Sequence, residues 1–221
     1  MANTVLLNNR DHADLRVITA RSADYGDDVM LALTFPAEFR SVQAHYPIVF
    51  RKSAEGQFQP VALFGLRDRQ NLFLTAAGWD ASYVPLMIER QPFLVGVASG
   101  EAMIHVDLDS PRISRTAGEP VFLPHGGTTV YLDRMSSILR AIHEAAEATP
   151  AFVATLVEHA LLEPFVFDFA LADGSRLRLT SFHTINEERL RELPGEVLER
   201  LSRAGYLQAI YMVLASLSHL R

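Results

Sequence analysis

The sequence predicts an α+β protein, with largely antiparallel short strands in the first half and with helices and one β-hairpin in the second half. Residues 1–127 hold short apolar segments separated by turn residues, a pattern typical of strands joined by tight connections. Residues 128–221 instead repeat apolar side chains at spacings of three and four, which indicates amphipathic helices. Two alternating segments at 165–169 and 176–179, joined through Asp173-Gly174, predict the hairpin.

The size and composition fit one folded domain over residues 1–221, β-rich over 1–127 and helix-rich over 128–221. A hydrophobic fraction of 49% with 21% charged residues is typical of a chain that buries a core. The net charge of −6, with scattered Lys and Arg, argues against nucleic acid as a partner, because such binding needs a basic face. The absence of cysteine excludes disulfides and thiol chemistry. Nothing in the sequence specifies an oligomeric state.

Two stretches bear on cellular location. The N-terminal residues 1–16 lack a basic start followed by a long apolar core, so no signal peptide is expected. The longest uncharged run, 204–220, is shorter than the roughly 20 residues that a membrane-spanning helix needs. We therefore expect a cytoplasmic, soluble protein without membrane insertion.

Apolar segments bounded by Gly, Pro and Asp predict the strands of the first half. A proline at Pro36, suited to a first helical turn, predicts a short helix from Phe35 that ends before Tyr46-Pro47. Ser99-Gly100 is expected to turn between the last two strands. The predicted strands comprise residues 15–18, 29–33, 48–51, 60–66, 72–74, 93–97 and 102–107.

Periodic apolar residues and capping signals predict the helices of the second half. The stripe over 129–148 predicts one helix, and Thr149-Pro150 predicts the start of another, since threonine is a good N-cap and proline suits the first position. Either Thr184 or Asn186 is expected to cap the helix that opens at Glu187. Pro194 begins the next helix and Gly205 ends it; the last helix is expected to carry a stripe of Leu207, Ile210, Tyr211, Leu214 and Leu217.

Residues 78–93 contain the only tryptophan together with prolines and an Arg-Gln-Pro-Phe ending. These aromatic residues are typical of core plugs, with Arg90 paired to an acid. Alternatively they form a rigid aromatic pocket in which Arg90 grips a ligand carboxylate. The predicted ligand-binding residues are Trp79, Tyr83, Arg90, Phe93 and Tyr46.

His105-Val106-Asp107 is the most catalytic-looking pattern. Residues i and i+2 of a strand share a face, so this histidine and this aspartate are suited to bind Fe(II) together. A distal histidine, His183 or His143, would complete the facial triad of a non-haem oxygenase. The alternative is a surface histidine beside a turn, and in that case no cofactor is needed.

The order of several motifs resembles the bacterial SapC family, and the resemblance spans nearly the whole chain. The C-terminal part of the resemblance is Phe182 to Leu190 followed by Gly205 to Leu217. The N-terminal part comprises Tyr46-Pro47-Ile48-Val49-Phe50, Ala62-Leu63-Phe64-Gly65-Leu66, Asn71-Leu72-Phe73, Trp79, Tyr83-Val84-Pro85 and Arg90-Gln91-Pro92-Phe93.

The resemblance implies a context more than a reaction. Members of the family are often encoded near TonB-dependent receptors, cupin-like proteins and flavin-dependent tryptophan halogenases. This implies an accessory binding protein that handles a peptide or small imported molecule, and we lean away from an enzyme. Two alternatives stay open: a non-haem Fe(II)-dependent oxygenase using His105, Asp107 and His183, and a structural protein partner in a cell-surface export assembly.

Overall fold

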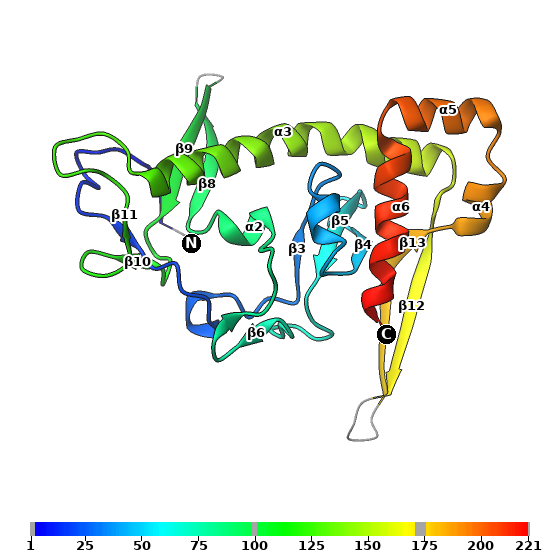
Figure 1. The fold of residues 1–221 in the computed structure, drawn as a ribbon, viewed down its shortest axis with the longest axis horizontal. Helices are drawn as coiled ribbons and strands as arrows, with labels where there is room; N and C mark the ends of the chain where they lie inside the picture. The colour runs from blue at the N-terminus through cyan, green and yellow to red at the C-terminus, as the bar shows by residue number, and fades with distance from the viewer. Residues whose placement is uncertain (1–2, 99–100, 171–175, 221) are drawn as a thin grey trace. The chain divides into compact units, whose positions relative to one another are not determined.

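Five antiparallel strands form the largest sheet, in the order β12-β13-β4-β5-β3 (Figure 1). The strand β5 lies beside the edge and pairs Ala62 with Ile48 of β4 on one side and with Ala32 of β3 on the other. β3 is therefore an edge strand, and the long hairpin β12-β13 forms the opposite side of the sheet. Together with the helices, this sheet confirms the α+β class. The strands are β3 (Leu31–Leu33), β4 (Ile48–Lys52), β5 (Phe58–Leu63), β12 (Leu162–Ala170) and β13 (Arg176–Ile185).

The computed structural model describes residues 3–98, 101–170 and 176–220, and the chain divides into two compact units. Each unit is assembled from three separate segments of the chain. The expected turns at Ser99-Gly100 and Asp173-Gly174 lie outside the described residues. Unit 1 comprises Met1–Asp28, Phe73–Asp80 and Leu86–Glu144; unit 2 comprises Val29–Leu72, Ala81–Pro85 and Ala145–Arg221.

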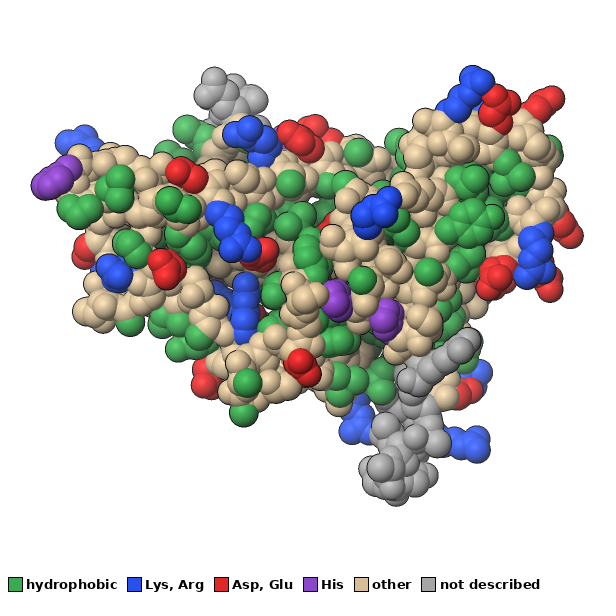
Figure 2. Space-filling model, in the orientation of Figure 1, with side chains coloured by type: hydrophobic (Ala, Val, Ile, Leu, Met, Phe, Trp, Pro, Cys, Tyr) green, Lys and Arg blue, Asp and Glu red, His purple; other side chains and the backbone are tan. Residues whose placement is uncertain are grey.

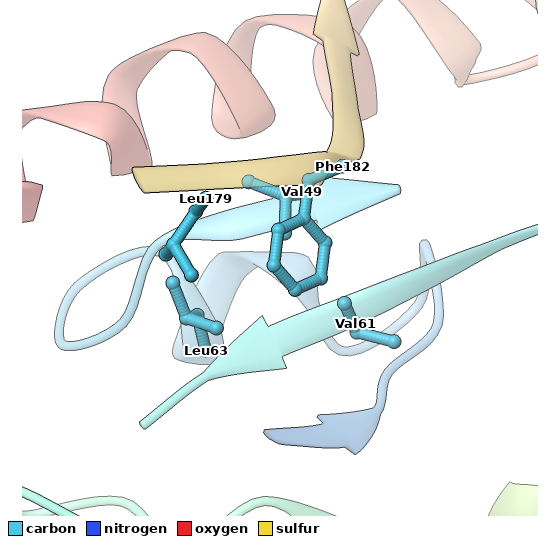
Figure 3. Close-up of a cluster of buried hydrophobic side chains, with 5 residues drawn as sticks. All are labelled: Val49, Val61, Leu63, Leu179 and Phe182. Carbon is cyan, nitrogen blue, oxygen red and sulfur yellow. The ribbon is translucent and has the colours of Figure 1, made fainter. Parts of the chain in front are cut away.

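The sheet of unit 2 buries a cluster of apolar side chains contributed by its three inner strands. Figure 3 shows these side chains pointing toward one another from β4, β5 and β13. In β5, Val61 and Leu63 share a face because residues i and i+2 of a strand project to the same side. In β13, Leu179 and Phe182 are three residues apart, and they lie on either side of the irregularity at which the β12–β13 register shifts. The cluster consists of Val49, Val61, Leu63, Leu179 and Phe182.

The C-terminal helix of unit 2 is anchored to the sheet by a serine. The Ser216 hydroxyl accepts a hydrogen bond from the Ile48 N–H at 2.8 Å and donates to the Val213 carbonyl at 2.6 Å. The predicted stripe on this helix is wrong: Ile210 is buried as expected, but Tyr211 is exposed. Almost every residue of the helix is apolar, so its periodicity could not identify the buried face. The helices here are α1 (Phe39–Val42), α4 (Glu187–Arg191), α5 (Gly195–Arg203), α6 (Tyr206–Ser216) and η2 (Leu217–Leu220).

The caps of α4 and α5 follow the predicted signals. The Asn186 side chain accepts a hydrogen bond from the Arg189 N–H at 2.8 Å, so asparagine is the N-cap of α4. Thr184 cannot act there because it lies inside β13. Pro194 is the N-cap of α5, and Gly205 adopts a left-handed conformation between α5 and α6. Figure 2 shows acidic and basic side chains close together at the surface of α4 and α5, where ion pairs such as Glu187 with Arg191 form.

Unit 1 is built from three small antiparallel sheets. The order β1-β9-β8 includes the predicted strand pair over 93–107, while β10-β2-β11 and β6-β7 are short. β6 overlaps the predicted strand 72–74 at Leu74, whereas β7 and α2 lie within residues 78–93, for which no strand or helix was predicted. The elements are β1 (Thr4–Leu6), β2 (Arg16–Val17), η1 (Ala23–Tyr25), β6 (Leu74–Thr75), β7 (Gly78–Trp79), α2 (Leu86–Glu89), β8 (Phe93–Ala98), β9 (Glu101–Asp107), β10 (Ile113–Ser114) and β11 (Glu119–Pro120).

A buried ion pair lies in the interior of unit 1. Asp27 is fully buried, and both of its carboxylate oxygens accept hydrogen bonds from Nη2 of Arg112 at 2.6 Å. Arg112, which is 1% exposed, also donates to the carbonyls of Ile18 and Ala20. Arg21 adds a second, more distant contact to the same carboxylate at 3.2 Å. The pair therefore connects segments that are 85 residues apart in the sequence.

The helix α3 (Val130–Glu158) runs without interruption through the position at which a new helix was expected. The prediction of a helix start at Thr149-Pro150 is therefore wrong. The Thr149 hydroxyl does not cap: it donates back to the Ala145 carbonyl at 2.7 Å, a bond that a threonine inside a helix can make. Pro150 lies in the helix interior.

In the part of the chain that the structure describes, no helix has both the length and the apolar character required to cross a lipid bilayer.

Candidate functional site

A groove of about 750 Å³ lies in unit 2, between the C-terminal half of α3 and one end of the five-stranded sheet. Its volume falls within the range of small-molecule sites, about 300–1,000 Å³. Most of its surface is apolar, which is also typical of such sites. The lining residues are Leu33, Thr34, Phe35, Gly56, Gln57, Phe58, Gln59, Pro60, Ala146, Thr149, Pro150, Val153, Ala154, Val157 and Glu158.

One stripe of α3 forms the helical wall of this groove. The lining positions follow one another at spacings of three, one, three, one, three and one, so they share one face of the helix. The opposite wall consists of the end of β3, the β4–β5 turn and the start of β5. The Thr34 N–H donates to the Pro60 carbonyl at 3.1 Å, which fixes these two segments side by side.

Pro150 gives the helical wall a backbone acceptor. Proline has no N–H, so the carbonyl of Ala146 loses the partner that an α-helix normally supplies four residues later. Ala146 and Pro150 both line the groove. The carbonyl of Ala146, on the groove wall, therefore lacks the helical donor that it would otherwise have at position 150.

A buried hydrogen-bond network adjoins the groove. Glu38, which is 5% exposed, accepts hydrogen bonds from the hydroxyls of Thr34 and Tyr83, each at 2.9 Å. The Tyr46 hydroxyl in turn donates to the backbone carbonyl of Tyr83. Because Thr34 also lines the groove, this network holds the β3 end of its wall in place.

The predicted ligand-binding residues are divided between the two units. Tyr46 and Tyr83 belong to unit 2 and are joined by the hydrogen bond just described. Trp79, Arg90 and Phe93 belong to unit 1. Tyr46 and Phe93 are fully buried, whereas the other three side chains are partly exposed. The proposed aromatic ligand site over these five residues stays a prediction.

Arg90 has no acidic partner among the described residues. Its guanidinium donates to the Phe93 carbonyl at 2.6 Å, and burial lowers its pKa from the ordinary value. The expected pairing of Arg90 with an acid is therefore wrong; its neighbour Glu89 pairs with Arg134 instead. The Arg90 side chain acts here as a support for the backbone at the start of β8.

The three residues of the predicted iron site also lie in different units. His105 and Asp107 are on β9 in unit 1, and His183 is on β13 in unit 2, while His143 is on α3 in unit 1. The His105 ring packs on Gly96, where an added Cβ would lie 2.3 Å from Nδ1. Within residues 3–98, 101–170 and 176–220, no three His, Asp or Glu side chains cluster closely enough to hold a metal ion. The iron hypothesis stays a prediction.

His183 lies behind the groove wall. Its ring packs edge-on against Phe58 at 4.8 Å, and its Nδ1 is buried without a hydrogen-bond partner in the described structure. Burial and the nearby positive charge of Lys52 lower the pKa of His183.

We expect replacement of Lys52 by glutamine to raise the pKa of His183, while burial keeps that pKa below the value of an exposed histidine. Because the folded state binds the proton less readily than the unfolded state, His183 lowers stability as the pH falls through the ordinary histidine pKa. An NMR titration of the histidine ring protons measures the pKa, and urea denaturation at several pH values measures the stability. An unchanged or lower pKa in the Lys52→Gln protein would contradict the assignment.

The sequence contained part of the signal for the groove. The small and apolar stripe from Ala146 to Val157 is visible in the sequence, but Thr149-Pro150 indicated a break there. The opposite wall comes from residues 33–35 and 56–60, far earlier in the chain, and only the tertiary structure places them beside the helix.

Sheet, helix and groove define an α+β protein whose larger sheet carries an apolar groove at one end. The SapC family model matches residues 7–221, so the chain belongs to the SapC family. Searches of curated proteins and of solved structures gave no match.

Proposed function

We propose that this SapC protein is a binding protein that holds a peptide or small molecule in the apolar groove of unit 2. The observation that carries the proposal is the groove itself, with its volume of about 750 Å³ and its predominantly apolar lining. A ligand that leaves water for such a surface gains roughly 25 cal/mol for each Å² of apolar area buried. The hydrophobic effect thus accounts for ligand binding, and no chemical reaction in the groove is required.

The polar groups of the groove favour binding over catalysis. General acid–base chemistry and nucleophilic chemistry need a titratable side chain together with a partner that orients or activates it. Glu158 is the one titratable side chain among the described lining residues, and it is exposed. The hydroxyls of Thr34 and Thr149 are already engaged, with Glu38 and with the Ala145 carbonyl.

Substitution of Ala154 by phenylalanine is expected to weaken the binding of an apolar dye by tenfold or more. Ala154 lies on the groove wall and is exposed, so the larger ring occupies the groove without disturbing the core. We would measure this with Nile red, whose fluorescence rises in apolar surroundings. A tenfold loss corresponds to about 1.4 kcal/mol of binding free energy.

Ala148→Phe is the matched control, because Ala148 is exposed on the same helix but does not line the groove. It introduces the same ring and should leave the affinity for Nile red unchanged. Melting curves for both variants establish that they are folded. Equal affinities in the native protein and in both variants would remove the groove as the binding site.

A further inference from the structure

The groove has the length of a short extended chain. Its helical wall runs from Ala146 to Glu158, which at 1.5 Å rise for each residue gives about 18 Å. An extended peptide advances about 3.3 Å for each residue, so about five residues fit along this wall. A compact ligand would leave much of this length unused.

The backbone acceptor identifies the kind of chain. An alkyl chain offers no N–H to the Ala146 carbonyl that Pro150 leaves without its helical donor, whereas every non-proline residue of a peptide offers one. Gln57 and Gln59 also line the groove, and the amide of a glutamine side chain both donates and accepts hydrogen bonds. Amide groups on the wall suit amide groups in the ligand.

The charged residues at the edge of the groove determine which sign of charge the ligand should carry. Glu158 is at the end of α3, and its nearest ionic contact is a 4.0 Å approach to the ring of His159. A second acid, Glu55, adjoins the lining residue Gly56 in the β4–β5 turn. Positive charges also lie nearby: the Lys52 ammonium is over the Phe58 ring, Arg51 pairs with the lining residue Gln59, and Arg189 donates to the His159 carbonyl. None of these three residues lines the groove. The charge on the lining itself is therefore negative.

We infer that the groove binds an extended, apolar peptide segment of about five residues with a positive charge at the end that meets Glu158. The inference rests on the proposed binding function and adds the class of ligand. Apolar side chains of the segment pack between the helix and the sheet end, and one of its N–H groups donates to the Ala146 carbonyl. Its basic end is a lysine, an arginine or a free amino terminus.

The test uses calorimetric titration of the full chain with two capped pentapeptides that share four apolar residues and end in either lysine or glutamate. We expect the lysine peptide to bind about fivefold tighter to the native protein, a factor typical of one exposed ion pair. Glu158→Lys should reverse this preference. Glu144→Lys, an exposed reversal on the same helix away from the groove, should preserve it.

The outcomes separate this inference from the proposed function. Equal affinities of the two peptides for the native protein, or an unaltered preference in Glu158→Lys, would overturn the peptide assignment. If dodecylamine displaces Nile red while neither peptide does, the groove binds apolar ligands but not peptides, and only the present inference fails. If Nile red itself does not bind, the proposed function fails as well.

Discussion

Replacement of Asp27 by asparagine is expected to lower the free energy of unfolding of unit 1 by about 3–5 kcal/mol, the usual cost of removing one member of a buried ion pair. Asparagine keeps the shape of the side chain but removes its charge. The guanidinium of Arg112 would then be buried at 1% exposure without its main counter-charge. Arg21 contacts the same carboxylate, so its position would also be less well fixed.

Urea denaturation measures the loss, and hydrogen exchange followed by mass spectrometry locates it. Faster exchange should concentrate in the segments of unit 1. Asp24→Asn makes the same chemical change at an exposed position three residues earlier, and surface substitutions of this kind usually stay within about 0.5 kcal/mol. Equal losses of unfolding free energy in Asp27→Asn and Asp24→Asn would show that the buried ion pair contributes no more to stability than an exposed aspartate does.

Replacement of Pro150 by alanine is expected to raise the free energy of unfolding by about 2 kcal/mol. Proline in a helix interior costs about 3 kcal/mol relative to alanine, because a hydrogen bond is lost and the ring crowds the preceding turn. About 1 kcal/mol of the gain is offset, since proline also restricts the unfolded chain. The same change supplies the helical N–H that the Ala146 carbonyl lacks, so this carbonyl would no longer be available to the proposed peptide.

Two measurements check this prediction. Urea denaturation should show the gain in stability, whereas Pro194→Ala should show none, because Pro194 is an N-cap and interrupts no helical hydrogen bond. Calorimetry should show weaker binding of the lysine peptide to Pro150→Ala, with the affinity for Nile red retained. A stability that is unchanged or lower would mean that the helix gains nothing from the restored bond.

A proline inside α3 that lowers stability is consistent with a functional role for the groove. Natural proteins often depart from the most stable choice at functional sites, where the departure serves binding. Pro150 is the only proline of α3, and it lies on the wall of the groove. The prediction for Pro150 therefore tests stability and binding in one variant.

Local patterns predicted most of the secondary structure because they reflect short-range physics. The apolar run of β5 is typical of a strand buried on both faces, and the neighbouring residues Val61 and Ala62 are indeed both fully buried. The cap at Asn186 and the break at Gly205 depend on neighbouring residues alone; Asn186 was one of the two caps predicted, and the break was predicted outright. At Thr149-Pro150 the local signal was wrong, because the bond from the Thr149 hydroxyl to Ala145 is compatible with an unbroken helix.

The sequence by itself thus determined the α+β class, the positions of most helices and strands, and the resemblance to the family to which the chain belongs. Only the tertiary structure decided how these elements pair. It joined Asp27 to Arg112, separated Trp79 from Tyr83 into different units, and placed the β4–β5 turn beside α3. Propensities and caps act over a few residues, whereas a groove is formed by the packing of segments distant in the chain, and no local pattern records that packing.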